Sequence, residues 1–232
     1  MKKYKAVFFD LDHTLWDFEA NSKATLHHIY YHYHLAAAGV PDFEAFYQSY
    51  KFHNERLWDR YRKGFISRNE LKWKRMWLTL LDFKIADEPK AKELAEVFIT
   101  MLPQQTQLFP HAEKVLDYCQ AKGYRLALIT NGFEDTQMKK LASCNIAKYF
   151  QHVVTSERSQ SVKPHAQIFE YALSISDATA PEALMIGDSL DVDISGAQNV
   201  GMDQVYFNPL REQHQQQPTY EIDCLSQLLQ IL

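Results

Sequence analysis

The sequence has few cysteines, no long apolar run and no excess of basic residues, and each shortage narrows the function. The three cysteines, Cys119, Cys144 and Cys224, are odd in number and lack the spacing of metal ligands. We therefore expect reduced thiols and a cytoplasmic protein. No segment approaches the length that spans a bilayer, and the apolar stretch after Lys5 meets Asp10 too soon for a secretion signal.

The charge balance predicts a small-molecule partner. A net charge of -4 and a pI near 6.2 give no general attraction for a nucleic acid polymer or an anionic membrane. An anionic substrate must then be held by local positive groups. With 232 residues, of which 46% are hydrophobic, the chain can form one large globular domain or a core with an insertion. We expect a monomer or a small homo-oligomer.

Residues 17–103 carry helical patterning with few strand signals, which predicts an inserted all-helical cap with its own small core. Ser67 and Glu70 form a capping box before an amphipathic run, so a helix is expected to begin there. The many aromatics of this segment either pack its core or, around Trp58 and Tyr61, face a nucleobase. His28 and His32 lie one helical turn apart, but no carboxylate or cysteine joins them at helical spacing, so we interpret them as surface residues.

The rest of the chain, residues 1–16 and 104–232, alternates between helix and strand patterns. Alternation of this kind predicts an α/β fold, with a doubly wound parallel sheet between two layers of helices. The expected strands are 6–9, 125–131, 151–156, 183–188 and 203–208, and the expected helices are 111–123, 134–144, 165–175 and 193–201. A polar tract at 211–218 is expected to be a solvated loop.

Polar side chains follow most of the predicted strands at the points where the strands end. Because a parallel sheet gathers the carboxyl ends of its strands along one edge, these residues are expected to converge. Side chains at i and i+2 on an extended chain also point the same way. The converging set is Asp10 and Asp12 after the first strand, Thr130 and Asn131 after the second, Asp188 after 183–187, and Lys163, which is expected to begin a helix with Pro164.

This set of residues suits phosphoryl transfer. Asp10 and Asp188 can share a hard divalent cation such as Mg²⁺, which prefers oxygen ligands. Asp10 can attack phosphorus and form an aspartyl phosphate, while Asp12 protonates the departing oxygen and later removes a proton from water. Lys163 and Thr130 can hold the phosphoryl oxygens on which negative charge is spread in the transition state.

Each of these residues also has a purely structural interpretation. Asp12 could cap a helix after the first strand, and Thr130 and Asn131 could cap the next one. Lys163 could be a solvated surface lysine. Asp188 could belong to a turn with an acidic helix start. All of these would have to coincide by accident at strand ends and in this order, so we favour the catalytic interpretation.

The sequence resembles the haloacid dehalogenase superfamily in four motifs that occur in that family's order across nearly the whole chain. DLDHT at 10–14 matches the first motif DxDxT, and ITNG at 129–132 matches the second. VKP at 162–164 and GDSLDVD at 187–193 match the third and fourth. The third motif departs from the usual KPxP, because His165 and Ala166 follow Pro164.

The resemblance implies a Rossmann-like core with a helical cap inserted after the first strand, and a Mg²⁺-dependent active site. For catalysis it implies Asp10 as nucleophile and Asp12 as acid/base. For the phosphoryl group it implies Thr130 and Lys163 as phosphate holders and Asn131 and Gly132 as further contacts. For the metal it implies that Asp10, the Asp12 carbonyl and Asp188 bind Mg²⁺ and that Asp193 supports the site.

The resemblance also narrows the reaction. The true dehalogenases lack the second acid of the first motif, so Asp12 points to a phosphatase or phosphomutase. The segments 57–71 and 129–137 resemble the 5'-phosphatases of noncanonical pyrimidine nucleoside monophosphates. A sugar phosphate phosphatase or phosphomutase uses the same core and remains an alternative. A receiver-like signalling module is phosphorylated on Asp, but it needs neither an acid/base such as Asp12 nor a large helical insert. A retired enzyme kept as a binding protein is disfavoured because no expected catalytic residue is missing.

Overall fold

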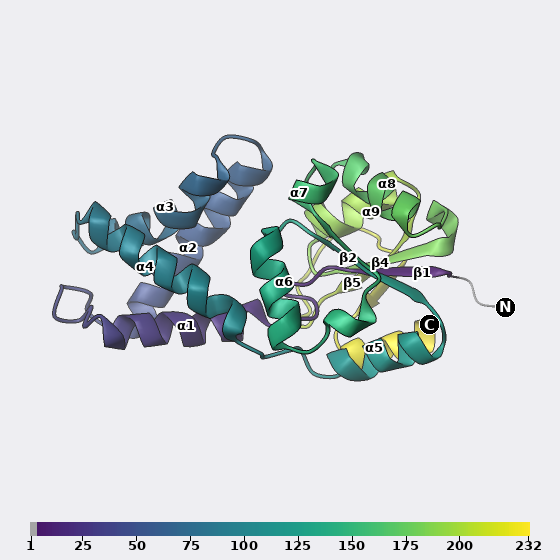
Figure 1. The fold of residues 1–232 in the computed structure, drawn as a ribbon, viewed down its shortest axis with the longest axis horizontal. Coiled ribbons are helices and arrows are strands. Elements are labelled where there is room, and N and C mark those ends of the chain that lie inside the picture. The colour runs from purple at the N-terminus through teal and green to yellow at the C-terminus, as the bar shows by residue number, and fades with distance from the viewer. Residues whose placement is uncertain (1–3) are drawn as a thin grey trace. The chain divides into compact units, whose positions relative to one another are not determined.

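The chain folds into two compact units in a computed structural model that describes residues 4–232. Of the described residues, those up to Phe18 and from Thr106 onward form one unit, and Glu19–Gln105 form the other. The first is an α/β unit that contains the sheet, and the second is helical (Figure 1).

A six-stranded parallel sheet forms the centre of the α/β unit. Its order is β3-β2-β1-β4-β5-β6, so the chain starts in the middle of the sheet and winds outward in both directions, as in a Rossmann-like fold. The predicted doubly wound sheet is confirmed. Strand β6, which has three residues and follows the glutamine-rich loop, has no counterpart among the expected strands. The strands are β1 (Ala6–Phe9), β2 (Arg125–Thr130), β3 (His152–Thr155), β4 (Ala183–Gly187), β5 (Asp203–Phe207) and β6 (Tyr220–Ile222).

Helices cover both faces of this sheet. The helices α8 (Ala166–Ile175) and α9 (Ser195–Asn199) pack together on one face, and α5 (Ala112–Ala121) lies with α10 (Leu228–Ile231) on the other (Figure 1). The four residues of β1 are fully buried, as expected for a strand covered on both sides. A Cβ on Gly196 would lie 2.4 Å from the Phe169 ring, so glycine allows α9 to approach α8 closely.

Two expected helix starts on the α/β unit were wrong. Lys163 and Pro164 do not begin a helix: the short α7 (Ser156–Ser159) follows β3, and α8 starts only at Ala166. The helix expected at 193 starts earlier, as a π-helical turn over Leu190–Ile194 that continues into α9. This turn lies beside the fourth motif, and π-helical turns often occur at functional sites. The other helix of this unit is α6 (Glu134–Ser143), which was expected.

The helical unit is formed by α1 (Phe18–His32), α2 (Phe43–Arg62), α3 (Arg68–Asp82) and α4 (Glu88–Met101). The predicted capping box is confirmed: the Ser67 side chain accepts from the backbone of Glu70, and the Glu70 carboxylate accepts from the backbone of Ser67. Most of the aromatics in this unit pack against one another. The chain also has 3-10 turns at Leu102–Gln104, Ala147–Tyr149, Ala180–Glu182 and Leu225–Gln227.

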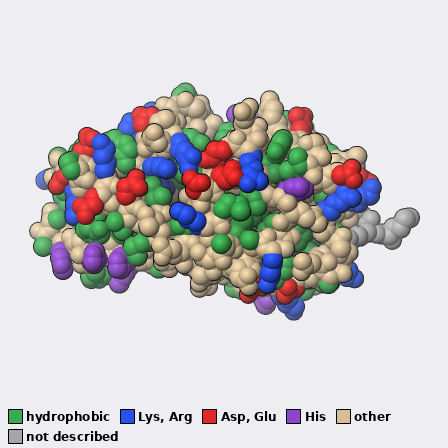
Figure 2. Space-filling view, viewed as in Figure 1, with side chains coloured by type: hydrophobic (Ala, Val, Ile, Leu, Met, Phe, Trp, Pro, Cys, Tyr) green, Lys and Arg blue, Asp and Glu red, His purple; other side chains and the backbone are tan. Residues whose placement is uncertain are grey.

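The surface carries no large region of a single charge on the face shown in Figure 2, where basic and acidic side chains are interspersed. Among residues 4–232, no helix combines the length and the apolar character that crossing a membrane requires. The tract at 211–218 has no regular structure, as expected.

Candidate active site

The sheet order brings the predicted strand-end residues to one edge. Strand β1 lies between β2 and β4, so Asp10, which follows β1, has Thr130 at the end of β2 on one side and Asp188 after β4 on the other. Carboxylate oxygens of Asp10, Asp188 and Asp193 all lie within 4.8 Å of one another. The residues that the sequence placed together are therefore neighbours in space.

Lys163 lies between two of these carboxylates. Its Nζ donates to Oδ1 of Asp10 at 2.5 Å and to Oδ1 of Asp193 at 2.6 Å, and the residue is only 2% exposed. It is not a solvated surface lysine. Burial lowers the pKa of Lys163, but the charges of Asp10 and Asp193 outweigh burial and raise it above its usual value. The ammonium is therefore held charged, and the third of its protons is left for another acceptor.

Asn131 fixes the backbone of Lys163 rather than offering its side chain to a ligand. Its Nδ2 donates to the Lys163 carbonyl at 3.0 Å, and its Oδ1 accepts from the Lys163 amide at 2.8 Å. Both polar atoms of the side chain are thus in use. This two-point hold explains how Lys163 reaches the acids although His165 and Ala166 replace the usual residues after the third motif.

The acidic cluster favours a cation. Burial raises the pKa of Asp10 well above its usual value, Lys163 opposes this, and the charges of Asp193, Asp188 and Asp12 add to it. Burial and the charge of Asp193 raise the pKa of Asp188 to about 7. Carboxylates are this difficult to ionise when they repel one another in a poorly solvated place, and a divalent cation would relieve the repulsion.

Asp193 reaches the cluster because Gly187 has no side chain. A Cβ on Gly187 would lie 2.4 Å from Oδ2 of Asp193. Asp193 is 1% exposed and also accepts from the Ser189 amide at 3.1 Å, so its carboxylate is fixed from two sides. The fourth motif thus combines a close approach of the backbone with two acids, and Asp188 is more than an acidic helix start.

Asp12 does not cap a helix, since α1 starts only at Phe18. Its Oδ1 accepts from Nζ of Lys140 at 2.5 Å and its Oδ2 from Nε2 of Gln137 at 2.9 Å. Burial raises the pKa of Asp12, but the charge and hydrogen bond of Lys140 and the hydrogen bond of Gln137 outweigh burial and lower it. Asp12 is therefore ionised where Asp10 resists ionisation.

Thr130 and Asn131 do not cap α6, whose N-cap is Phe133 without a side-chain cap. Oγ1 of Thr130 accepts from the Gly132 amide at 3.0 Å and from Nε2 of Gln137 at 2.8 Å. Both lone pairs of the hydroxyl are used, so its proton is directed to a different acceptor. The Gly132 amide is thus engaged by Thr130, and Gly132 stays a predicted contact of the phosphoryl group.

Three further residues belong to the site without having been expected there: Thr14, Gln137 and Lys140. Thr14 donates through Oγ1 to Oδ1 of Asp188 at 3.1 Å. Gln137 and Lys140 are buried on α6 together with Leu141. Their spacing in the sequence places both on one helical face, but polar residues at this spacing do not distinguish a buried face from a solvated one.

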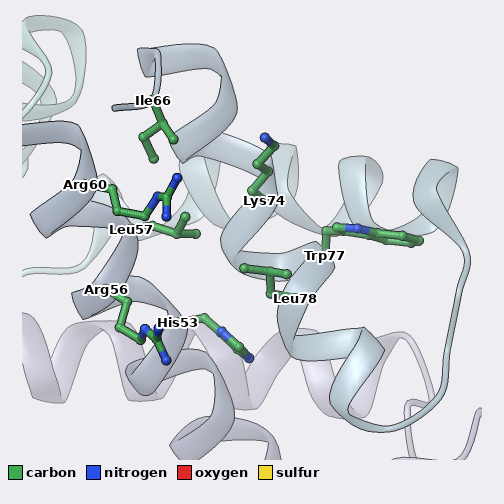
Figure 3. A pocket seen from close by; sticks show the side chains of 8 residues that line it. All are labelled: His53, Arg56, Leu57, Arg60, Ile66, Lys74, Trp77 and Leu78. Carbon is green, nitrogen blue, oxygen red and sulfur yellow. The ribbon is translucent and has the colours of Figure 1, made fainter. Parts of the chain in front are cut away.

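The helical unit has a pocket of its own, of about 450 Å³, and its chemistry differs from that of the acidic cluster. No carboxylate lines it, and neither Trp58 nor Tyr61 does; their rings pack edge to face with centroids 5.7 Å apart. The pocket is lined by His53, Arg56, Leu57, Arg60, Ile66, Lys74, Trp77 and Leu78 (Figure 3). Among residues 4–232, the acidic cluster is the only group of at least three potential metal-ligating side chains whose ligand atoms lie within 4.8 Å of one another.

The comparison with known protein families agrees with the four motifs. Residues 4–201 match the haloacid dehalogenase-like hydrolases. The chain belongs to this family. The hydrolase is 35% identical over 232 residues to a protein of Streptococcus pneumoniae named pyrimidine 5'-nucleotidase PynA, with 99% of this chain and 95% of the relative covered. It is 30% identical over 238 residues to the pyrimidine 5'-nucleotidase YjjG of Escherichia coli, with 99% and 98% covered.

A solved structure shows the same fold for the hydrolase. The putative hydrolase YfnB of Bacillus subtilis, described as bound to magnesium, superposes with a TM-score of 0.88 at 28% identity and covers 99% of both chains. The Rossmann-like α/β core with an inserted helical cap domain, which the motifs implied, is confirmed.

Proposed function

We propose that this hydrolase is a Mg²⁺-dependent phosphatase that cleaves a pyrimidine nucleoside 5'-monophosphate through an aspartyl phosphate on Asp10. One observation carries the proposal. Oδ1 of Asp10 is held by Lys163, whereas no residue among 4–232 donates a hydrogen bond to Oδ2, which leaves this oxygen as the nucleophile. Asp12, Thr130 and Lys163 stand around it with the groups that the reaction needs.

The residues present fit a magnesium ion. Asp10, Asp188 and the carbonyl of Asp12 would hold it, and that carbonyl accepts no backbone hydrogen bond in the described part of the chain. Asp193 would support the site through Lys163. When bound, the ion neutralises charge on the phosphoryl oxygens and on the cluster. The magnesium in the solved relative supports this choice of ion.

The protein side chains divide the reaction into two displacements. In the first, Oδ2 of Asp10 attacks phosphorus, the bond from phosphorus to the nucleoside oxygen breaks, and Asp12 gives that oxygen a proton. In the second, Asp12 takes a proton from water, the water oxygen attacks phosphorus, and the bond to Asp10 breaks to release phosphate. Thr130 and the remaining proton of Lys163 bind the phosphoryl oxygens.

The low pKa of Asp12 adds a requirement to the first displacement. Because Lys140 keeps Asp12 ionised in the free enzyme, Asp12 must take up its proton when the negatively charged phosphoryl group binds beside it. The ionised form is already suited to removing a proton from water in the second displacement. The presence of such an acid/base argues against a receiver-like module, which stores its phosphoryl group.

A substrate panel tests the proposal. Phosphate release should be measured with Mg²⁺ across nucleoside 5'-monophosphates and sugar phosphates, side by side. We expect the pyrimidine nucleoside 5'-monophosphates to have the highest kcat/KM, and removal of the metal by a chelator to abolish turnover. Higher kcat/KM for sugar phosphates would favour the sugar phosphatase, and no phosphate release from any ester would refute the proposed function.

The metal requirement should depend on pH. Since the pKa of Asp188 is raised to about 7, this residue is protonated below that pH and competes with a cation. We expect kcat/KM at limiting Mg²⁺ to rise as the pH increases toward about 7 and then to level off. Saturating Mg²⁺ should shift this rise in kcat/KM to lower pH. A rise whose position does not depend on Mg²⁺ would contradict its assignment to Asp188.

A further inference from the structure

Two buried polar residues of α6 are not explained by packing alone. Gln137 is fully buried and Lys140 is 3% exposed. A buried ammonium costs free energy unless it is paired, and a buried amide needs partners for its polar atoms. Both residues lie three positions apart, and thus on the same face of the helix. Their partners show what this face does.

Lys140 holds one oxygen of Asp12 in a closed environment. Its Nζ lies 2.5 Å from Oδ1 of Asp12, 4.3 Å from the centre of the Trp16 ring and 5.8 Å from the centre of the Phe18 ring. Aromatic faces attract a cation and exclude water from it. The ammonium is therefore confined between the rings and the carboxylate, and it fixes where Oδ1 lies.

Gln137 connects Asp12 to Thr130. Its Nε2 donates to Oδ2 of Asp12 at 2.9 Å and to Oγ1 of Thr130 at 2.8 Å. The amide cannot be turned around, because its oxygen would then face the acceptor-only carboxylate of Asp12. In this orientation Oε1 of Gln137 is buried without a hydrogen-bond partner, which lowers stability. The protein thus tolerates a loss of stability to keep Gln137 in this orientation, as expected for a functional position.

The second motif leaves room for this amide. A Cβ on Gly132 would lie 2.4 Å from both Cδ and Nε2 of Gln137. A side chain at position 132 would therefore displace Gln137 from Asp12 and Thr130. The glycine, the threonine and the glutamine form one unit, although Gly132 and Gln137 are five positions apart in the sequence.

We infer that Gln137 and Lys140 are positioning residues that hold the Asp12 carboxylate at the angle at which it delivers a proton to the leaving oxygen. Gln137 also aligns the Thr130 hydroxyl toward the phosphoryl group. This inference rests on the proposed function. Neither residue is assigned a contact with substrate. Protonation of the leaving oxygen by Asp12 instead depends on side chains of α6 that contact Asp12.

The leaving group provides the test. The leaving group of uridine 5'-monophosphate is the strongly basic 5'-alkoxide of uridine, which needs a proton. The leaving group of 4-nitrophenyl phosphate is a stabilised phenolate, which does not. Gln137→Met and Lys140→Met remove the donors at similar volume. We expect each to lower kcat/KM for uridine 5'-monophosphate on the order of 10²-fold, and kcat/KM for 4-nitrophenyl phosphate less than about tenfold. Gln137→Met should add a loss common to both esters, because it also releases Thr130.

Matched controls are available on exposed helical positions. Lys139→Met on α6 and Gln120→Met on α5 should leave both kcat/KM values and their ratio as in the wild type. Thermal unfolding of every variant checks the fold, and Gln137→Glu, which keeps the shape but brings a carboxylate to Asp12, replaces any variant that does not fold.

The outcomes separate the two claims. If the wild type cleaves neither ester, the proposed function fails and this inference falls with it. If the wild type cleaves both and the variants keep its ratio of kcat/KM values, whether by losing neither activity or by losing both equally, only the inference is overturned. A selective loss with the alkyl ester supports it, because a merely structural defect lowers the active fraction for both esters alike.

Discussion

Asp10→Asn should reduce turnover by at least about 10³-fold while the protein remains folded. The amide has nearly the same shape as the carboxylate, and its oxygen can still accept from Lys163, but it cannot form the aspartyl phosphate. Phosphate release under saturating substrate and Mg²⁺ measures the effect. Turnover near the wild-type level in this variant would exclude Asp10 as the nucleophile.

The stability of Asp10→Asn gives a second check on the electrostatics of the site. The pKa of Asp10 is raised, which means that the folded protein disfavours its charged form. Removing this charge should leave the metal-free melting temperature unchanged or higher. Asp191→Asn is a matched control, since Asp191 is exposed in the same acidic motif and its hydrogen bonds within residues 4–232 are to Gln216 and Ser195, outside the cluster. It should change neither turnover nor stability appreciably.

Lys163→Met should have the opposite effect on stability. The substitution keeps the volume of the side chain but leaves Asp10 and Asp193 buried without the ammonium that contacts both of them. Breaking a buried ion pair by removing one partner destabilises proteins by roughly 3–5 kcal/mol. Chemical denaturation without metal measures the free energy of unfolding, and turnover should fall as well because a phosphate-binding group is lost.

The pH dependence of Lys163→Met identifies the cause. Without the ammonium, the already raised pKa values of Asp10 and Asp188 should rise further. The folded state then binds more protons than the unfolded state, so stability falls as pH rises and recovers as pH is lowered toward about 5. Lys139→Met, at an exposed position, should stay within about 0.5 kcal/mol of the wild type at every pH. A loss in Lys163→Met that does not depend on pH would contradict this account.

The contrast between the two variants follows from one arrangement of charge. Three carboxylates lie close together in a place where Asp10 and Asp188 resist ionisation, and one buried lysine supplies part of the compensating charge. A neutral residue at position 10 removes part of the repulsion among the carboxylates. A neutral residue at position 163 leaves that repulsion without the compensating charge of the lysine. The remaining charge is what a divalent cation would compensate.

The sequence by itself determined the parallel sheet and which residues follow its strands. Buried parallel strands are near-continuous apolar runs, and acids cannot continue such a run, so Asp10 and Asp188 mark the strand ends. The order of strands then brings those ends to one edge. Ser67 with Glu70 likewise marks a helix start, because a capping box depends only on residues three positions apart. β6 escaped prediction since three residues give too little pattern.

Only the tertiary structure decided how the converging side chains pair. The Asn131 side chain binds the backbone of Lys163, and Lys140 reaches Asp12 across 128 positions of sequence. Local spacing specifies the face of a helix or strand on which a side chain lies, but its partner depends on which elements pack against that face. That packing depends on close approaches such as those at Gly132 and Gly187, where the distance between backbone and neighbouring side chain leaves no room for a Cβ.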